Sequence, residues 1–374
     1  MKLLTSRAIL SLFCLLAWLT LPLLRAQAPK PEPDVLIFSN GDKLIGQFVR
    51  SAGGSVTFKS DMLGEIHVDW SKIKELHAAK KYAVIPKDAK VDKANESKIP
   101  QGTVAVADQK IAVSTTPPQS IPVANAAYVV DEDTFQRVLL HSPGFFQSWT
   151  GTVTAGASLV EATQDSRTFT GGISLLRAIP TENWLDPRNR TTANFSASYG
   201  TVSQSGSPTL KTSIYHADGE RDQYFSPRVF AFGQIAYDHN FSQGLDLQQS
   251  YGGGIGVTLL KNSFQTLDLK GSIDYVDQQF QTSSSNQTLV GSIFSEAYLR
   301  KLPRGILFNE KLSINPAWNN TSAYSAVGSA GLTLPTYKRL SVSLNTIDTF
   351  LNDPPPGFRK NSFQLTLGLT YALQ

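Results

Sequence analysis

The densest group of polar side chains in the sequence is a set of alternate residues: His216, Asp218, Glu220 and Asp222. Alternate residues of a β-strand share a face, so these carboxylates could hold a hard cation such as Ca²⁺. No twelve-residue calcium loop pattern follows them. The competing interpretation is a solvated strand end with a turn around Gly219, and we predict no metal site and no cofactor.

A serine beside a histidine could form a hydrolytic nucleophile, because an imidazole can accept the hydroxyl proton. Two such pairs are close in sequence, His239 with Ser242 and His216 with Ser213. Neither lies in a Gly-x-Ser-x-Gly turn. The other histidines lack metal-ligand spacing: His67, His77 and His141. We therefore predict no catalytic residues and no enzyme activity, with a lipid hydrolase as the least favoured function.

Three charged residues share one face of a predicted strand: Asp268, Lys270 and Asp274. Inside a barrel they could line a water-filled lumen or neutralise one another in a plugged one. The prolines at residues 354–356 could bind a proline-recognition groove, although we favour a stiff loop tip.

The elements that would position these residues begin with an export signal. Lys2 and Arg7 precede an apolar stretch over residues 8–24, as in a secretory signal peptide. Cleavage after Ala28 gives a signal of residues 1–28, and Ala26 is the alternative site. A retained membrane anchor is the competing interpretation.

Removal of this signal changes the charge and the thiol content. The formal charge of +4 includes Lys2, Arg7 and Arg25, so the mature chain carries +1 and offers no electrostatic reason to bind nucleic acid. Cys14, the one cysteine, lies in the signal behind Leu12 and Phe13, which do not suit a lipidated cysteine. We expect neither a disulfide nor a lipid anchor.

A small β module is predicted over residues 34–80. Residues 35–38 and 44–49 are β-prone, and Asn40-Gly41-Asp42 between them suits a hairpin turn. Four or five such strands predict an SH3-like barrel, which resembles a fragment found in several secreted bacterial proteins.

The region from 81 to 146 is less regular. Residues 81–130 are predicted to be a linker with a degenerate second β repeat, because 102–106 echo 54–58 and 121–123 echo 66–68. Residues 131–146 predict a connecting helix, with Asp133 or Thr134 as its cap.

Residues 147–374 alternate large apolar side chains with small polar ones in segments of about ten residues, as in a transmembrane β-barrel. Residues 251–259 and 267–275 show the alternation well, and the last segment sets Phe363 and Leu367 against Gln364 and Gly368. A soluble sandwich would alternate too. The Gly/Ser/Thr-rich polar face, the export signal and aromatic residues near segment ends favour the membrane barrel.

About twelve segments can be counted, centred near residues 153, 172, 196, 213, 232, 253, 270, 293, 310, 328, 343 and 367. An even number places both barrel ends in the periplasm. The connections expected there are short at 261–263, 303–305 and 335–338. The link over 180–188 is long, which leaves an early miscount open.

From about residue 224 to 373 the sequence resembles the bacterial family of salt-induced outer membrane proteins, the YdiY-like group, defined by a domain of unknown function. The matching residues are Tyr224-Phe225-Ser226, Leu245-Asp246-Leu247, Tyr251-Gly252-Gly253-Gly254-Ile255-Gly256, Leu267-Asp268-Leu269-Lys270-Gly271 and Asn352-Asp353-Pro354-Pro355-Pro356-Gly357-Phe358. The resemblance implies a C-terminal β-barrel in the outer membrane and no known reaction. Gln248 and Gln249 stand where an arginine is usual, and the chain ends on Gln374 rather than on an aromatic residue.

The sequence thus predicts an all-β protein, a transmembrane antiparallel barrel of about twelve strands behind an SH3-like module. We expect export by the general secretory pathway to the outer membrane and a structural or narrow-pore role. Expected partners are outer-membrane lipids, the barrel-assembly machinery and a periplasmic or peptidoglycan partner of the module. A soluble secreted β protein that binds a ligand or partner is the main alternative.

Overall fold

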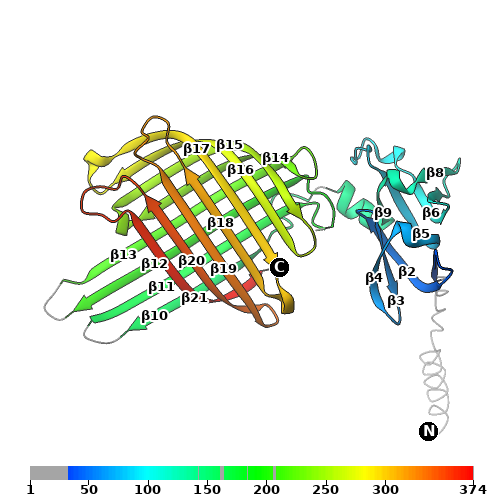
Figure 1. The fold of residues 1–374 in the computed structure, drawn as a ribbon, viewed down its shortest axis with the longest axis horizontal. Coiled ribbons are helices and arrows are strands. Elements are labelled where there is room, and N and C mark those ends of the chain that lie inside the picture. The colour runs from blue at the N-terminus through cyan, green and yellow to red at the C-terminus, as the bar shows by residue number, and fades with distance from the viewer. Residues whose placement is uncertain (1–32, 142, 161–163, 183, 205–207, 374) are drawn as a thin grey trace, which may run out of the picture. The chain divides into compact units, whose positions relative to one another are not determined.

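A computed structural model describes residues 33–141, 143–160, 164–182, 184–204 and 208–373 of the chain. The predicted signal, residues 1–28, lies outside these ranges. The described residues form two compact units that divide after Phe135 (Figure 1).

The N-terminal unit is a nine-stranded antiparallel sheet in the order β4-β3-β2-β1-β5-β6-β7-β8, with β9 paired to both β2 and β5. Its strands are β1 (Asp34–Phe38), β2 (Lys43–Ala52), β3 (Ser55–Ser60), β4 (Gly64–Asp69), β5 (Ile73–Pro86), β6 (Gln101–Ala107), β7 (Lys110–Val113), β8 (Gln119–Pro122) and β9 (Ala126–Asp131). Short 3₁₀ turns connect some of them: η1 (Trp70–Lys72), η2 (Glu96–Lys98) and η3 (Val123–Asn125). The predicted turn at Asn40 is present, where its side chain accepts a hydrogen bond from the Asp42 amide at 3.0 Å.

Bulky apolar side chains from alternate positions fill the interior of this module. Leu36, Val56, Phe58 and Leu76 are fully buried. Removing this apolar surface from water is the main stabilising term of such a small domain.

Two polar side chains tie the strands together within that core. The buried Asp34 carboxylate accepts hydrogen bonds from the Phe48 amide at 2.7 Å and the Ala79 amide at 2.8 Å. The Tyr82 hydroxyl donates to the Phe48 carbonyl at 2.5 Å. Burial, followed by the nearby Asp34 charge, raises the pKa of Tyr82 well above its ordinary value of 10.

The module does not end at residue 80. Residues 81–130, predicted as a linker with a degenerate repeat, contribute β6 to β9, and Val104, Ile111 and Val129 are buried in the same core as Leu36. The strands β7 and β8 have only four residues each, too few for a clear alternation. The echoed segments 66–68 and 121–123 are similar in one respect: β4 is followed by the 3₁₀ turn η1, and β8 by the 3₁₀ turn η3.

A short helix follows β9. It comprises α2 (Glu132–Thr134) and the π-helical η4 (Phe135–Leu140). Asp131, two or three residues before the predicted cap residues, caps it by accepting from the Thr134 amide at 3.0 Å. Within the described ranges, no helix has both the length and the hydrophobicity needed to cross a bilayer.

The C-terminal unit is a closed antiparallel barrel of twelve strands (Figure 1). They are β10 (Thr150–Val160), β11 (Gln164–Ile179), β12 (Asn189–Gln204), β13 (Leu210–Tyr224), β14 (Val229–Asn240), β15 (Leu245–Lys261), β16 (Gln265–Phe280), β17 (Gln287–Lys301), β18 (Leu307–Asn315), β19 (Ser325–Tyr337), β20 (Leu340–Leu351) and β21 (Asn361–Leu373). The first and last strands close the ring, with Gly151 opposite Leu373 and Ala155 opposite Leu369. The predicted count is confirmed, and each predicted centre falls within its strand.

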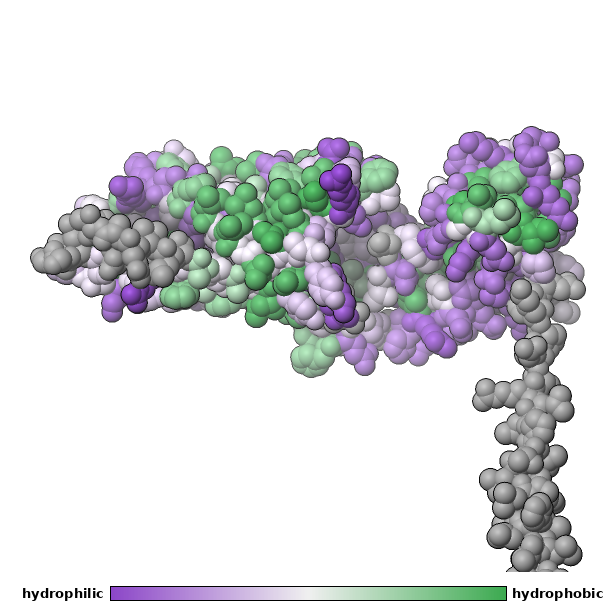
Figure 2. Space-filling view, turned by 90° about the horizontal axis from the view of Figure 1, so that it is seen from below, coloured by the Kyte–Doolittle hydropathy of each residue, from purple (hydrophilic) through white to green (hydrophobic). Residues whose placement is uncertain are grey.

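Large apolar side chains face outward from this ring. Phe363, Leu367 and Ile273 are exposed by 60% or more, while Asp268 and Asp274 on the opposite strand faces are buried. Figure 2 shows hydrophobic residues spread over the outer surface of the barrel strands. The alternation predicted from the sequence therefore has the orientation of a membrane barrel, and the two-sheet sandwich is excluded.

Both ends of the barrel chain lie at one rim, which we call the terminal end; the opposite rim is the distal end. The connections at 225–228, 262–264, 302–306 and 338–339 lie at the terminal end and are short. The longer link over 180–188 lies there too. Its length therefore reflects a loop and not a miscounted strand.

Candidate functional site

The barrel interior holds ion pairs that join strands far apart in the ring. Arg190 on β12 donates through Nε to Asp222 on β13 at 2.6 Å, and its Nη1 lies 2.8 Å from Asp268 on β16. One layer further from the terminal end, Lys270 on β16 pairs with Glu220 on β13 at 2.5 Å. The Arg190–Asp222 contact joins neighbouring strands, but the Arg190–Asp268 and Lys270–Glu220 contacts pass over β14 and β15, so the interior is bridged from one wall segment to another.

Aromatic rings line the same layer. The Arg190 guanidinium lies 5.4 Å from the centre of the Phe230 ring, and the Lys270 ammonium lies 5.3 Å from that of Phe232. Both phenylalanines point inward from β14 and are buried. Cation–π attraction adds to the ion pairs in such a desolvated setting.

Glycines of β15 make these contacts geometrically feasible. A Cβ atom on Gly254 would lie 1.9 Å from the Gly271 carbonyl oxygen, and one on Gly256 would lie 2.3 Å from Phe230. These two positions therefore have no room for a side chain, and the space beside them is taken by the Gly271 backbone and the Phe230 ring. The glycine-rich motif at 252–256 is required by this close approach.

A second polar cluster lies nearer the distal end. His216 contacts Asp238 through Nδ1 at 2.6 Å and Asp218 through Nε2 at 2.9 Å. The Asp218 carboxylate also accepts from the Asn194 amide at 2.8 Å, and Asp238 accepts from Gln248 at 3.1 Å. Gln248, where the resembled family usually has an arginine, thus acts as a hydrogen-bond donor inside the barrel.

The polar series from His216 to Asp222 does share one face, as strand periodicity predicts. It lies inside the barrel in the middle of β13, however, and Gly219 is a strand residue, so the solvated-turn interpretation is wrong. Each member has an ionic or hydrogen-bonding partner on another strand. Among the residues that the structure describes, no group of three or more His, Cys, Asp or Glu side chains could hold a metal ion.

Asp268, Lys270 and Asp274 do not neutralise one another. Asp268 and Lys270 pair with β12 and β13, as above, and Asp274 accepts from Gln234 at 2.8 Å and from Ser272. The sequence placed them correctly on the inner face. Their partners could not be predicted, because apart from Ser272 those partners lie on other strands.

The opposite inner wall is neutral. Thr154 on β10, Thr370 on β21 and Ser343 on β20 form a chain of hydroxyls with contacts of 2.9 and 2.8 Å. The ion pairs described above therefore lie away from this wall, on the β12 to β16 side of the interior.

The distal mouth is crossed by the β14–β15 connection. Gln243, fully buried in the turn η5 (Phe241–Gln243), donates through Nε2 to the carbonyls of Thr349 at 3.1 Å and Lys360 at 2.8 Å. These acceptors belong to β20 and the loop before β21, on the other side of the ring. Leu245, next to the turn, packs against Leu351 in a small apolar cluster with Phe280. This mouth clamp was not foreseen, because only the ring geometry brings residues 243 and 360 together.

The outer wall carries a different polar contact. Ser213 is not near His216 but bonds to His239, with Oγ and Nε2 2.9 Å apart. Ser242, the serine close to His239 in sequence, donates instead to Asn240 at 2.6 Å. Neither of the two candidate serine–histidine pairs forms, and the register of β13 against β14 brings together a third, Ser213 with His239.

Other singled-out residues lie apart from these clusters. His67 contacts Thr57 and His77 contacts Glu75 in the N-terminal module. The prolines at 354–356 lie in the distal connection between β20 and β21.

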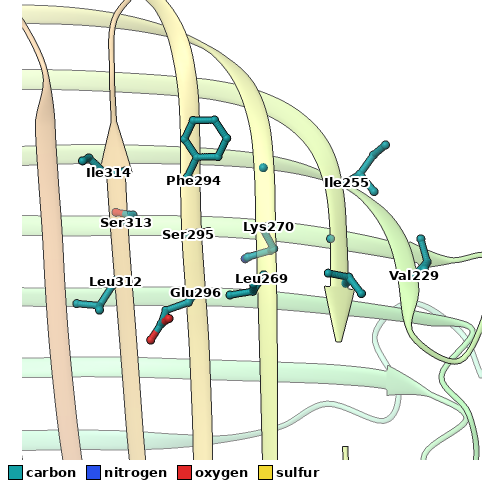
Figure 3. Close-up of a pocket in the computed structure, with 13 residues that line it drawn as sticks. Val229, Ile255, Leu269, Lys270, Phe294, Ser295, Glu296, Leu312, Ser313 and Ile314 are labelled. Atoms are coloured by element: carbon teal, nitrogen blue, oxygen red, sulfur yellow. The ribbon is translucent and has the colours of Figure 1, made fainter. Parts of the chain in front are cut away.

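A shallow depression of about 600 Å³ also lies on the outer wall, over β14 to β18. Figure 3 shows Phe294, Leu312 and Ile255 around it, with the Glu296 carboxylate among them. Gly271, which faces outward between Ile255 and Phe294, leaves the space. Apart from Glu296, the outward side chains here are apolar, which suits contact with lipid chains.

Comparisons with known proteins give one family match. The model of a family described as proteins of unknown function, DUF481, matches residues 153–373, which is the whole barrel but for its first residues. No curated protein sequence matches the chain.

Several solved barrels are similar at low identity. An outer membrane channel from Pseudomonas putida F1 is 14% identical with a TM-score of 0.36, covering 62% of this chain and 100% of the channel. The translocator domain of the autotransporter NalP from Neisseria meningitidis is 10% identical with a TM-score of 0.32, covering 60% and 86%. The β domain of the Bordetella autotransporter BrkA is 10% identical with a TM-score of 0.30, covering 60% and 98%. These low similarities say nothing about what the present chain does.

Proposed function

This chain belongs to the DUF481 family, and we propose that it is an exported outer-membrane β-barrel protein with a structural or narrow-pore role. The observation that carries the proposal is the inverted barrel: bulky apolar side chains outside, and an interior crossed by ion pairs and closed by the mouth clamp.

The outer surface supports the membrane location. Lipid offers no hydrogen bonds, so a β structure spans a bilayer only when its strands close on themselves, as β10 and β21 do here. Outward tyrosines near strand ends, such as Tyr199, Tyr275 and Tyr371, match the aromatic girdles of membrane barrels. The short connections at the terminal end correspond to periplasmic turns.

The interior supports little or no conduction. Arg190 and Lys270 reach across β14 and β15 to partners on other strands, and Gln243 spans the distal mouth. Twelve strands also enclose less space than the sixteen or more of large porins.

The N-terminal module would then act in the periplasm. The chain enters the barrel at its terminal end, so the preceding residues stay on the periplasmic side. We propose that the module binds a periplasmic or peptidoglycan partner, and that outer-membrane lipids and the barrel-assembly machinery are partners of the barrel.

Two measurements test the proposal on the full-length protein. It should sediment with outer membranes and migrate faster unheated than heated on a denaturing gel. Recovery in a soluble extract without any heat shift would contradict the membrane location.

Conductance of the refolded protein in a planar bilayer tests the pore role, and we expect small or no current. Gln243→Ala should increase open events, because it removes both contacts across the mouth. Gln249→Ala is the matched control, since Gln249 lies on the outer face of the same hairpin and contacts Tyr251. A steady large current from the unaltered protein would contradict a closed or narrow lumen.

A further inference from the structure

The serine–histidine contact on the outer barrel wall joins two strands at their distal ends. Tyr215 on β13 lies opposite His239 on β14, and Ser213, two residues before Tyr215, is on the same outward face. The Ser213 hydroxyl and His239 Nε2 are 2.9 Å apart, which is hydrogen-bond distance.

The second ring nitrogen of His239 fixes the direction of this bond. Its Nδ1 lies 2.7 Å from the backbone carbonyl oxygen of Asp246. A carbonyl oxygen can only accept, so Nδ1 carries the proton and the neutral ring presents its lone pair at Nε2. Ser213 therefore donates to His239, which is the arrangement in which a histidine activates a serine as a nucleophile.

A carboxylate lies behind the histidine. The Asp246 Oδ1 atom is 3.9 Å from His239 Nδ1, beside the carbonyl of the same residue. Its negative charge would stabilise the imidazolium that forms when the histidine takes the serine proton. Asp246 thus supplies both an orienting carbonyl and a counter-charge.

His216, the other histidine of β13, cannot serve in this way. It points into the barrel, and both of its ring nitrogens contact carboxylates, those of Asp218 and Asp238. The two histidines therefore differ: His216 is held in the interior network, and His239 has one nitrogen directed at a hydroxyl.

The surroundings of the pair are those of a membrane interface. Tyr215 stacks on His239 with ring centres 5.5 Å apart, and Tyr199, opposite Ser213 on β12, is also exposed on the outer wall. Aromatic girdles mark the level of lipid headgroups, where the ester bonds of phospholipids lie. Lys211 shares the outward face of β13 with Ser213 and supplies a positive charge for an anionic headgroup.

We propose that Ser213 and His239, with Asp246, form a serine-hydrolase site that cleaves acyl esters of phospholipids in the leaflet around the distal end of the barrel. The site goes beyond the structural or pore role and rests on the proposed membrane location for its substrate.

The reaction follows acyl-transfer chemistry. Ser213 Oγ attacks the ester carbonyl carbon and its proton passes to His239 Nε2. The tetrahedral intermediate expels the lysolipid oxygen, which takes that proton, and leaves an acyl-serine. Water then attacks the acyl carbon, gives a proton to His239, and the fatty acid leaves as Ser213 regains its proton.

The stabiliser of the oxyanion would be found on the edge of β13. Among the described strands, β13 pairs with β14 only as far as Ile214 opposite Asn240, while its pairing with β12 continues to Leu210. The backbone of residues 211–213 thus pairs with no strand on the side of β14, where the turn η5 contacts β13. Backbone N–H groups in such a place can stabilise a developing oxyanion.

The test uses the full-length protein refolded in detergent and in vesicles of phosphatidylethanolamine and phosphatidylglycerol. A fluorophosphonate probe reports a nucleophilic serine, and release of a labelled fatty acid reports lipolysis. We expect both signals from the unaltered protein, and Ser213→Ala should abolish both. His239→Gln should lower labelling and release at least 100-fold. Asp246→Asn should lower release about tenfold, because the backbone carbonyl remains.

Ser242→Ala is the matched control, since that hydroxyl bonds to Asn240 and not to a histidine, and it should leave both signals unchanged. A heat shift on a denaturing gel must show that every variant is folded. A folded protein that takes no probe, or a Ser213→Ala variant that keeps both signals, overturns the proposal. Loss of the heat shift, or absence from the outer membrane, would instead overturn the membrane role. Probe labelling in detergent without lipid release would show a nucleophilic serine whose substrate is not phospholipid, which also overturns the proposal.

Discussion

In both the N-terminal module and the barrel, apolar and polar side chains alternate along the strands. The module buries the apolar side chains, whereas the barrel buries the polar ones. In the module, Val56 and Phe58 are fully buried. In the barrel, Leu367 and Phe363 are among the most exposed side chains, and Asp268 and Asp274 are buried. The difference shows that strand period alone does not say which face meets water. The residue types at the polar positions do distinguish the two cases, because glycine, serine and threonine are small enough to fit a barrel interior.

The two regions also differ in what holds them together. The module depends on apolar burial in one core. The barrel depends on strand closure, with ion pairs such as Arg190 to Asp268 spanning its interior. Three predictions test this contrast.

The largest effect is expected in the module core. Phe58→Ala should destabilise the module by about 4 kcal/mol, because it removes a fully buried ring and leaves a cavity. Limited proteolysis of the full-length protein in denaturant measures this as earlier cleavage within residues 33–135. Met62→Ala, at a side chain that is 94% exposed, should change stability by less than about 0.5 kcal/mol. Equal effects of the two changes would contradict a single packed core.

A matched pair of leucines tests the two surfaces. Leu63 in the module and Leu367 in the barrel are both 65% exposed. Leu367→Arg should cost about 3 kcal/mol for the barrel in lipid, because the charge would face hydrocarbon near the middle of β21. Leu63→Arg should change stability by less than about 0.5 kcal/mol, because that side chain faces water. Urea unfolding in vesicles measures both, and a harmless Leu367→Arg would show that the barrel wall is hydrated.

The smallest effect concerns Tyr82. Tyr82→Phe should cost about 1 kcal/mol near neutral pH by removing its bond to the Phe48 carbonyl. The raised pKa of Tyr82 also makes stability pH-dependent. Below the unfolded pKa of 10 its contribution is complete; as pH rises further, the unfolded state ionises while the folded state keeps its proton, so stability falls. When unfolding is measured at increasing alkaline pH, the difference in free energy of unfolding between the unaltered protein and Tyr82→Phe should decrease. A constant difference up to pH 11 would contradict this reading of the buried hydroxyl.

Features that depend on one strand at a time could be predicted from the sequence. The twelve strands, their outward faces and the inward position of Asp268 follow from local alternation. Features that depend on register could not. Ser213 and His239 are 26 residues apart and meet only because β13 and β14 are paired with Tyr215 opposite His239.

The contacts that depend on closure of the ring could not be predicted from the sequence for the same reason. Gln243 reaches Lys360 only across the mouth, and Arg190 reaches Asp268 across the interior, past β15 positions that have no room for a side chain. The length of the module was underestimated because β7 and β8 have only four residues each, which is too few to show an alternating pattern.

One hairpin, β14 with β15, carries both the glutamine that latches the mouth and, on its outer side, the histidine and aspartate beside Ser213. His239 and Asp246 stand on either side of the turn that holds Gln243. Breaking the contacts of Gln243 across the mouth would therefore shift the His239 imidazole relative to the Ser213 hydroxyl. Conversely, a lipid bound at this pair on the outer wall would affect the contacts at the mouth. The inner and outer contacts of this wall are therefore carried by one hairpin.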